Sequence, residues 1–117
     1  MLRRWLGLEG EKLAERFLRA RGLELVTRNY RCRHGEIDLV MREGSSLVFV
    51  EVRRRSRSDY GGAAASVDAH KQKRLIAAAR HYLAHYAGEP PPCRFDVVAI
   101  DGAGAPQWLP DAFADMP

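Results

Sequence analysis

The sequence predicts a single α/β domain in which a mixed β-sheet is flanked by helices. Three observations lead to this fold class: an amphipathic helical pattern near the start of the chain, a run of strand patterns after it, and a second helical pattern followed by a strand that is apolar on both faces. The chain of 117 residues is long enough to bury one hydrophobic core without disulfides or structural metals. We therefore expect one domain over residues 1–117.

The first helix is predicted over residues 9–22, EGEKLAERFLRARG. Its apolar side chains recur at helical spacing and share one face: Leu13, Ala14, Phe17 and Leu18. Gly22 ends the helix, because glycine is the residue that most often follows a helix C-terminus. Residues 23–30, LELVTRNY, predict the first strand.

A β-hairpin is predicted next, with arms at residues 35–42 and 47–54 joined through EGSS. Its connection is either a two-residue type II′ turn on Gly44 and Ser45 or a four-residue loop over 43–46. Both alternatives give the same register, in which the numbers of paired residues sum to 89.

This register brings two carboxylates together. Asp38 lies opposite Glu51 and Glu36 lies opposite Arg53, and the alternation of side chains places Asp38, Glu51 and Arg53 on one face. Directly opposed like charges destabilise a sheet, so the two acids need a cation between them. That cation is either Arg53, in a structural ion pair, or a divalent metal ion. The remaining alternative is an exposed sheet face with ordinary acids.

The second half of the chain predicts one helix and two strands. After a loop at 56–66, the helix runs over residues 67–87 and is ended by GEPPP. Its apolar stripe consists of Leu75, Ala78, Ala79, Tyr82, Leu83 and Tyr86. Residues 93–100, CRFDVVAI, are apolar on both faces and are expected in the centre of the sheet. A short strand at 107–109 and a turn at 111–114 complete the chain.

The charge of the chain is unevenly distributed. Residues 1–57 hold 14 Lys and Arg against 8 Asp and Glu, whereas residues 58–117 hold 5 against 7. Sixteen of the nineteen cationic residues are Arg, which suits bidentate contacts to phosphate. A basic half in a small domain indicates a polyanionic partner; the alternative is a general preference for Arg over Lys.

Three features indicate a soluble cytoplasmic protein without a membrane partner. Cys32 and Cys93 lie far apart and form no CxxC or metal-binding spacing, so both are expected to be reduced thiols. The N-terminal segment becomes charged again before an apolar stretch of signal-peptide length can form. No segment approaches the apolar length of a membrane span.

The spacing D-x12-E-x-[K/R] on a hairpin is typical of phosphodiester cleavage. Carboxylate oxygens suit Mg²⁺ or Mn²⁺, which also bind phosphate oxygens. Such an ion lowers the pKa of a bound water, and a nearby cation stabilises the developing negative charge. Asp38, Glu51 and Arg53 supply these three parts.

Six linked segments resemble a known family. GEKLAERFLRARG, RNYRCRHG, GEIDLV, VFVEVRRR, KQKRLIAAARHYL and RFDVVAI together resemble the YraN-like family of uncharacterised bacterial proteins, over residues 7–100. That family is similar to the PD-(D/E)xK nuclease superfamily, which includes archaeal Holliday junction resolvases and restriction endonucleases. The resemblance implies a restriction endonuclease-like, Holliday junction resolvase-like core and DNA cleavage with Mg²⁺ or Mn²⁺.

The superfamily motif falls on particular residues of this chain. Asp38 matches its first acid, and Glu51 with Arg53 matches its E-x-K. Its helical acid, a third metal ligand, falls on Glu11, which lies at the edge of the buried stripe, whereas Glu15 points further outward. The alternative for Glu11 is a solvated side chain in the first turn.

Arg53 departs from the family pattern, which has lysine at this position. Arginine can stabilise charge or hold a phosphate, but it is a poor general base because it does not lose its proton. Some superfamily members carry the lysine on a neighbouring helix, and Lys71 could fill that role here. A solvated lysine at the helix start is the alternative.

Further cationic residues are candidates for nucleic-acid binding. The segment RRRSRSDYGG fits a loop that contacts phosphates, and the candidates as a whole are Arg28, Arg31, Arg54, Arg55, Arg57, Tyr60, Lys71 and Arg74. The alternative is a solvated basic surface. His81 and His85 have the spacing of a zinc pair but no third ligand. Asp96 is expected to be a buried acid satisfied by backbone or Arg partners.

Two functions from different classes remain. The first is a metal-dependent endonuclease that hydrolyses phosphodiester bonds in DNA, including branched or damaged DNA. The second is a non-catalytic nucleic-acid-binding module on a nuclease scaffold. The retained pair of Asp38 and Glu51 favours the enzyme, and Arg53 favours the binding module. RNA as the substrate and a homodimer as the assembly stay open.

Overall fold

A computed structural model describes residues 2–54, 67–100 and 106–114, with side chains from residue 9 onward. Within these residues, the elements follow one another in the predicted order of one helix, three strands, a further helix and two strands. Their bounds are α1 Leu2–Ala20, β1 Glu24–Cys32, β2 Gly35–Glu43, β3 Ser46–Arg54, α3 Ala69–Ala84, β4 Cys93–Ile100 and β5 Gln107–Phe113.

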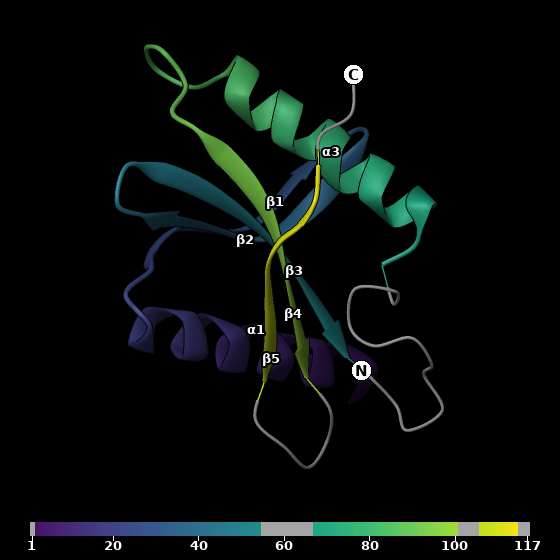
Figure 1. Ribbon diagram of the computed structural model, residues 1–117. Coiled ribbons are helices and arrows are strands. Elements are labelled where there is room, and N and C mark those ends of the chain that lie inside the picture. The colour runs from purple at the N-terminus through teal and green to yellow at the C-terminus, as the bar shows by residue number, and fades with distance from the viewer. Residues whose placement is uncertain (1, 55–66, 101–105, 115–117) are drawn as a thin grey trace.

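The strands form one five-stranded sheet in the order β1-β2-β3-β4-β5. The pair β3–β4 is parallel and the other three pairs are antiparallel, so the sheet is mixed. Helix α3 lies in the connection between the two parallel strands. Figure 1 shows α1 against one face of the sheet and α3 against the other. This confirms the predicted fold class, a mixed sheet flanked by helices that is compatible with a restriction endonuclease-like core.

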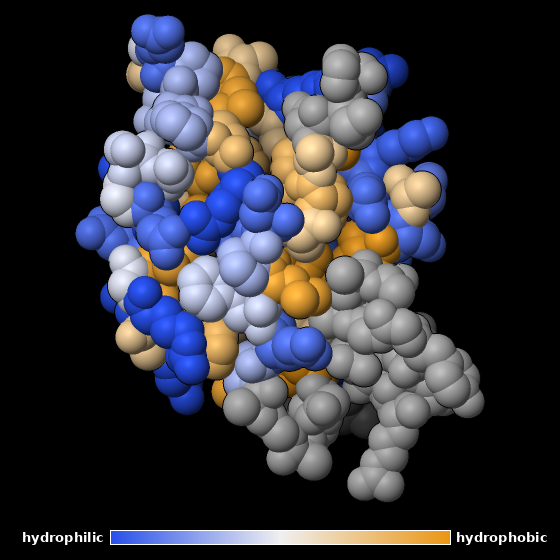
Figure 2. Space-filling view, viewed as in Figure 1, coloured by the Kyte–Doolittle hydropathy of each residue, from blue (hydrophilic) through white to orange (hydrophobic). Residues whose placement is uncertain are grey.

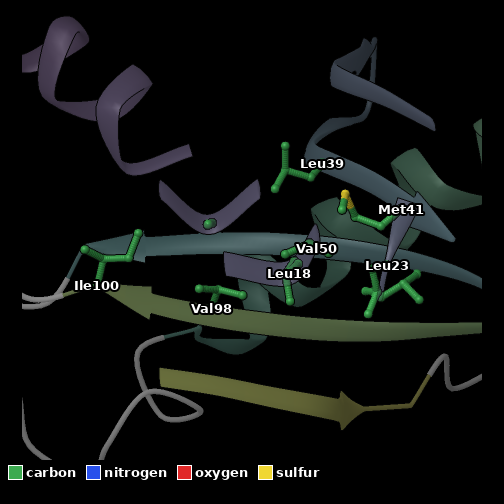
Figure 3. Close-up of a cluster of buried hydrophobic side chains, with 9 residues drawn as sticks. Leu18, Leu23, Leu39, Met41, Val50, Val98 and Ile100 are labelled. Carbon is green, nitrogen blue, oxygen red and sulfur yellow. The ribbon is translucent and has the colours of Figure 1, made fainter. Parts of the chain in front are cut away.

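The α1 side of the sheet carries the first part of the core. Ala14 and Leu18 of α1 are fully buried against side chains from three strands. Figure 3 shows this cluster, which contains Leu23, Leu39, Met41, Val48, Val50, Val98 and Ile100 besides the two helical residues. Burying side chains of this kind contributes about 1.5–3 kcal/mol each, so the cluster fixes α1 on the sheet.

The α3 side carries the second part, which is richer in aromatic rings. Its buried members are Ile37, Val40, Leu47, Phe49, Leu75, Ala78, Ala79 and Phe95. Tyr82 packs edge-on against both Phe49 and Tyr30, at ring-centroid distances of 5.8 and 5.2 Å. Figure 2, which has the view of Figure 1, shows hydrophobic residues in the middle of the molecule, between hydrophilic ones. The apolar stripe predicted for the second helix is therefore confirmed.

The predicted register of the hairpin is also confirmed for the five residue pairs nearest the turn. Cα partners run from Glu43 and Ser46 to Leu39 and Val50, and their numbers sum to 89. Gly44 has φ +59°, and Ser45 is not among the non-glycine residues with positive φ, which is the type II′ pattern. The two-residue turn is thus the alternative that this chain uses.

Strand β2 begins in close contact with α3 through Gly35. A Cβ atom at Gly35 would lie 2.1 Å from the backbone oxygen of Arg74, so only glycine fits there. This contact places the N-terminal half of α3 directly over the start of β2. The position of Lys71, one turn before Arg74, depends on it.

Some element bounds differ from the predictions. Helix α1 begins at Leu2, and Leu13 is 41% exposed instead of buried, because the helix turns Ala14 and Leu18 toward the sheet. Helix α3 spans Ala69–Ala84, shorter than predicted at both ends. The predicted turn at 111–114 is wrong, since β5 continues to Phe113.

Asp96 explains the length of β5. It is fully buried in β4 and accepts hydrogen bonds from Arg94, from Trp108 Nε1 at 2.9 Å and from the backbone N–H of Asp111 at 2.9 Å. The register between β4 and β5 shifts at this point, between Phe95 and Val97. The carboxylate therefore satisfies donors at an irregularity, as predicted for a buried acid with backbone and Arg partners.

Two simpler predictions concern cysteines and membranes. Cys32 and Cys93 are both free thiols, as expected. In the part of the chain that the structure describes, no helix is long and apolar enough to cross a membrane.

Replacing Gly35 with alanine is expected to lower the free energy of unfolding by about 1–3 kcal/mol, the usual cost of overpacking. Gly10→Ala is the control, because a Cβ there meets only Ile100 Cδ1 at an ordinary 4.0 Å. Alanine within a helix should stabilise by about 0.5–1 kcal/mol. Urea unfolding of both variants measures the difference, and equal stabilities would contradict the close contact.

Candidate active site

The candidate site lies where the β2–β3 ladder ends. The last Cα pair is Leu39 with Val50, and continuing the register would place Ile37 opposite Val52. Instead, Asp38 Oδ2 accepts a hydrogen bond of 2.8 Å from the backbone N–H of Val52. A side-chain carboxylate therefore takes the place of a backbone acceptor at the fork between the strands.

This geometry corrects part of the predicted register. Asp38 and Glu51 are not a ladder pair, and Glu36 does not face Arg53. The reason is that the start of β2, before Leu39, pairs with β1 and not with β3. Glu36 pairs with Arg31 of β1 and forms an ion pair with it at 3.4 Å.

The side chains of Asp38 and Glu51 nevertheless meet by a hydrogen bond. Burial, followed by the charge of Asp38, raises the pKa of Glu51 from 4.5 to about 8, so Glu51 is the protonated partner that donates. Burial also raises the pKa of Asp38, while the hydrogen bonds from Val52 and Glu51 act in the opposite direction. The two acids thus share one proton in a site that is short of positive charge.

Two cations lie near this pair without neutralising it. Lys71 and Arg53 both act to lower the pKa of Glu51, but their effects are smaller than that of burial. Among the described residues, no ion pair joins either cation to Asp38 or Glu51. Arg53 Nε is buried and has no hydrogen-bond partner there. The alternative of a structural ion pair made by Arg53 is therefore wrong.

Glu11 of α1 lies within the electrostatic field of the pair. Burial and then the charge of Asp38 raise the pKa of Glu11 from 4.5 to about 7, against a hydrogen bond from Asn29. Asn29 has the left-handed φ of +51°, which short polar side chains tolerate. Within the described ranges, no three His, Cys, Asp or Glu side chains form a ready-made metal cluster. Glu11 as a metal ligand stays a prediction.

The relative burial of the two helical acids was predicted wrongly. Glu15 is only 7% exposed, whereas Glu11 is half-buried. The reason is a partner that helical periodicity alone does not reveal, since Glu15 forms a bidentate ion pair with Arg28 of β1.

A cavity of about 210 Å³ opens beside Glu51. Its lining consists of Glu36, Glu51, His70, Lys71, Arg74 and Leu75. Helix α3 starts here because Asp68 caps it, accepting a hydrogen bond of 2.9 Å from the backbone N–H of Lys71. The cavity therefore joins the acids of the hairpin to the cationic first turns of α3.

Sequence reasoning missed three residues around this site: Asn29, Glu36 and His70. The position of His70 next to Lys71 at a predicted helix start was a usable signal. Asn29 and Glu36 carried no such signal, because their roles depend on the way β2 turns from β3 toward β1.

The predicted nucleic-acid-binding residues fall into separate groups. Lys71 and Arg74 line the cavity, Arg54 is exposed at the end of β3, and Arg28 and Arg31 are ion-paired on β1. Three further predicted residues, Arg55, Arg57 and Tyr60, lie outside the described residues.

The histidine pair on α3 has local partners. His81 Nδ1 hydrogen-bonds with the hydroxyl of Tyr30, and His85 Nδ1 contacts the backbone oxygen of His81 at 2.8 Å. In the described part of the chain, no third ligand completes a zinc site with them.

The fold and this site together define an α/β protein with a half-buried carboxylate pair at the fork of a hairpin. The model of UPF0102, an uncharacterised protein family, matches residues 10–100. The chain therefore belongs to UPF0102, which confirms the predicted YraN-like family.

Relatives within the family match over almost the whole chain. The UPF0102 protein of Aeromonas hydrophila is 57% identical over 109 residues, covering 92% of this chain and 83% of its own length. The UPF0102 protein of Ralstonia pickettii is 59% identical over 111 residues, covering 92% and 88%. That of Methylobacillus flagellatus is 50% identical over 111 residues, covering 93% and 96%.

The shared proton predicts a pH-dependent stability. Unfolded Glu51 ionises near pH 4.5 and folded Glu51 only near 8, so the stability of the folded chain falls as the pH rises between these values. Glu51→Gln removes this loss and should raise the free energy of unfolding at pH 8 by more than about 1 kcal/mol, the equivalent of one pKa unit.

Urea unfolding at pH 5 and pH 8, with a chelator present, measures this difference. The exposed Glu89→Gln serves as the control and should behave as the parent at both pH values. A Glu51→Gln variant less stable than the parent at pH 8 would rule out the strained pair.

Proposed function

We propose that this chain is a metal-dependent endonuclease that hydrolyses phosphodiester bonds in DNA, with Asp38 and Glu51 holding a Mg²⁺ or Mn²⁺ ion. The observation that carries the proposal is the half-buried, hydrogen-bonded carboxylate pair, which neither Lys71 nor Arg53 joins in an ion pair among the described residues. Buried charges are normally paired or coordinate metals. A pair that remains protonated beside Lys71 and Arg53 lacks a stronger cation.

The donor set suits a hard divalent ion. Mg²⁺ is usually bound by one or two carboxylates, with waters and substrate phosphates completing its shell. Ligands must be deprotonated, so binding would displace the proton that Asp38 and Glu51 share. When bound, the ion would lower the pKa of a water and neutralise charge on the phosphate.

The protein's own residues would position the substrate. Val52 fixes Asp38 through its backbone N–H, and Lys71 and Arg74 give the adjoining cavity a positive wall. Arg53 supports a role toward phosphate, because its buried Nε has no partner among the described residues. An unsatisfied buried donor costs about 1–3 kcal/mol, which a phosphate oxygen would offset.

The second candidate function is a non-catalytic nucleic-acid-binding module. Arg53 favours it, because arginine does not release a proton and therefore cannot replace a lysine that acts as a base. Both functions share the metal site and the cationic cavity. They differ in whether a DNA panel of linear, single-stranded, flapped and four-way substrates is cut when Mn²⁺ is added.

Asp38→Asn combined with Glu51→Gln should abolish Mn²⁺ binding and cleavage, because no carboxylate of the pair remains. Calorimetric titration with Mn²⁺ and cleavage of the DNA panel measure the two losses. Glu24→Gln with Glu89→Gln is the matched control, since both acids are exposed and distant in sequence from the pair. Equal Mn²⁺ affinity in the parent and the double variant would refute the metal site.

Variants of Arg53 and Lys71 identify the source of the catalytic charge. Arg53→Ala should slow cleavage about 10²–10³-fold, the usual loss for one preorganised electrostatic contact, whereas Arg53→Lys should keep or increase the rate. A comparable loss in Lys71→Ala would show that the lysine role lies on α3. Arg42→Ala, at the turn end of the hairpin, is the control.

The binding-module function predicts a different pattern in the same experiment. The parent then binds Mn²⁺ and DNA but cuts nothing, and Arg53→Lys gains activity on the intact carboxylate pair. Cleavage by the parent excludes this second function.

A further inference from the structure

A second cationic surface lies on the α1 side of the molecule. A groove of about 410 Å³ runs between α1 and β1 and is lined by Lys12, Glu15, Arg16, Arg19 and Arg28; we name it the α1 groove. Four of its five side chains are cations and one is an acid. This surface lies on a different layer from the cavity at α3, because α1 and α3 cover opposite faces of the sheet (Figure 1).

Glu15 holds two of these arginines in place. Its carboxylate accepts 2.7 and 2.9 Å hydrogen bonds from Nε and Nη2 of Arg28, and one of 3.3 Å from Nη1 of Arg19. The side chain of Glu15 is only 9% exposed, whereas those of Arg19 and Arg28 remain 60% and 57% exposed. The acid is therefore covered by the two guanidinium groups, which stay open to solvent.

Most of the hydrogen-bond donors in the α1 groove remain available. A guanidinium has five N–H donors, of which Arg28 uses two and Arg19 uses one on Glu15. In the described residues, Lys12 and Arg16 have neither a hydrogen-bond nor an ion-pair partner. One carboxylate cannot neutralise four cations, so the groove keeps an excess of positive charge.

The helix that carries the groove also carries Glu11, the helical acid predicted for the candidate active site. Glu11, whose pKa is raised in part by Asp38, directly precedes Lys12 on α1. From Lys12 the cations continue at helical spacing to Arg16 and Arg19, along about 10 Å of helix axis. That length corresponds to about three base-pair steps of a duplex.

We infer that the α1 groove binds the phosphate backbone of a DNA arm that leaves the candidate active site on the α1 side. This inference rests on the proposed function for the position of the substrate. Phosphate is favoured because three of the four cations are arginines, two of them preorganised by Glu15 with free donors. Lys71 and Arg74 on the α3 side and the α1 groove on the other side would then hold the substrate from both helical layers of the fold.

The test removes the two cations that have no partner in the described residues. Lys12→Ser with Arg16→Ser is compared with Lys73→Ser with Arg42→Ser, which also removes one exposed lysine and one exposed arginine. Fluorescence anisotropy measures binding of linear and four-way DNA by the full chain, with chelator present and over a series of salt concentrations. The groove variant should lose about two units of the slope of log K against log salt and at least about tenfold in affinity at 0.1 M salt. The control variant should keep the slope of the parent.

Several results would overturn the inference. These are a groove variant that binds DNA as the parent does, a parent that binds no DNA, and a control variant that loses as much as the groove variant. A groove variant that binds DNA as the parent does but loses binding to vesicles containing phosphatidylserine would also overturn the inference. It would assign the groove to a membrane surface.

Mn²⁺ titration of the same variants separates this inference from the proposed function. Groove-dependent DNA binding by a parent that binds no Mn²⁺ supports the α1 groove while contradicting the metal site. Unchanged DNA binding by a groove variant that still binds Mn²⁺ overturns the groove and leaves the metal site standing.

Discussion

The hydrogen bond between the Asp38 carboxylate and the backbone N–H of Val52 is the contact on which the site depends. It forms where β2 leaves β3, and it satisfies a donor that a continuing ladder would have paired with backbone. The same contact fixes the Asp38 carboxylate beside Glu51. A strand that paired normally to its end would hold the two acids apart on a regular sheet, so the fork is both a structural irregularity and the origin of the carboxylate pair.

The fork also lets both helical layers reach one place. Glu11 approaches Asp38 from α1, and Lys71 affects the pair from α3, although the two helices cover opposite faces of the sheet. The two cores hold the helices there, and Gly35 permits the backbone of α3 to approach the start of β2. The packing of the domain therefore decides which charges meet at the end of the ladder.

The sequence predicted features set by local rules and missed those set by partners distant in the chain. Turn chemistry at Gly44 gave the register, and apolar periodicity gave the element order and the inner position of β4, between β3 and β5. The register also predicted that Asp38 and Glu51 lie close together, although they meet at the fork and not as a ladder pair, and the family resemblance pointed to Lys71. Periodicity could not show that Arg28 draws Glu15 inward, that Asp96 extends β5, or that β2 pairs with β3 only from Leu39 onward.

The balance of charge at the fork differs from that of a structural ion pair. In a structural pair, arginine would contact the acids and lower their pKa values, yet burial outweighs both Arg53 and Lys71 here and leaves Glu51 protonated. Keeping the Arg53 guanidinium and the two acids close together without an ion pair costs stability. In the described residues, no hydrogen bond to Arg53 Nε compensates for this cost. Sites that bind charged ligands commonly accept such a cost, because the ligand later supplies the missing partner. A divalent cation for the acids and a phosphate for Arg53 would supply both partners at once.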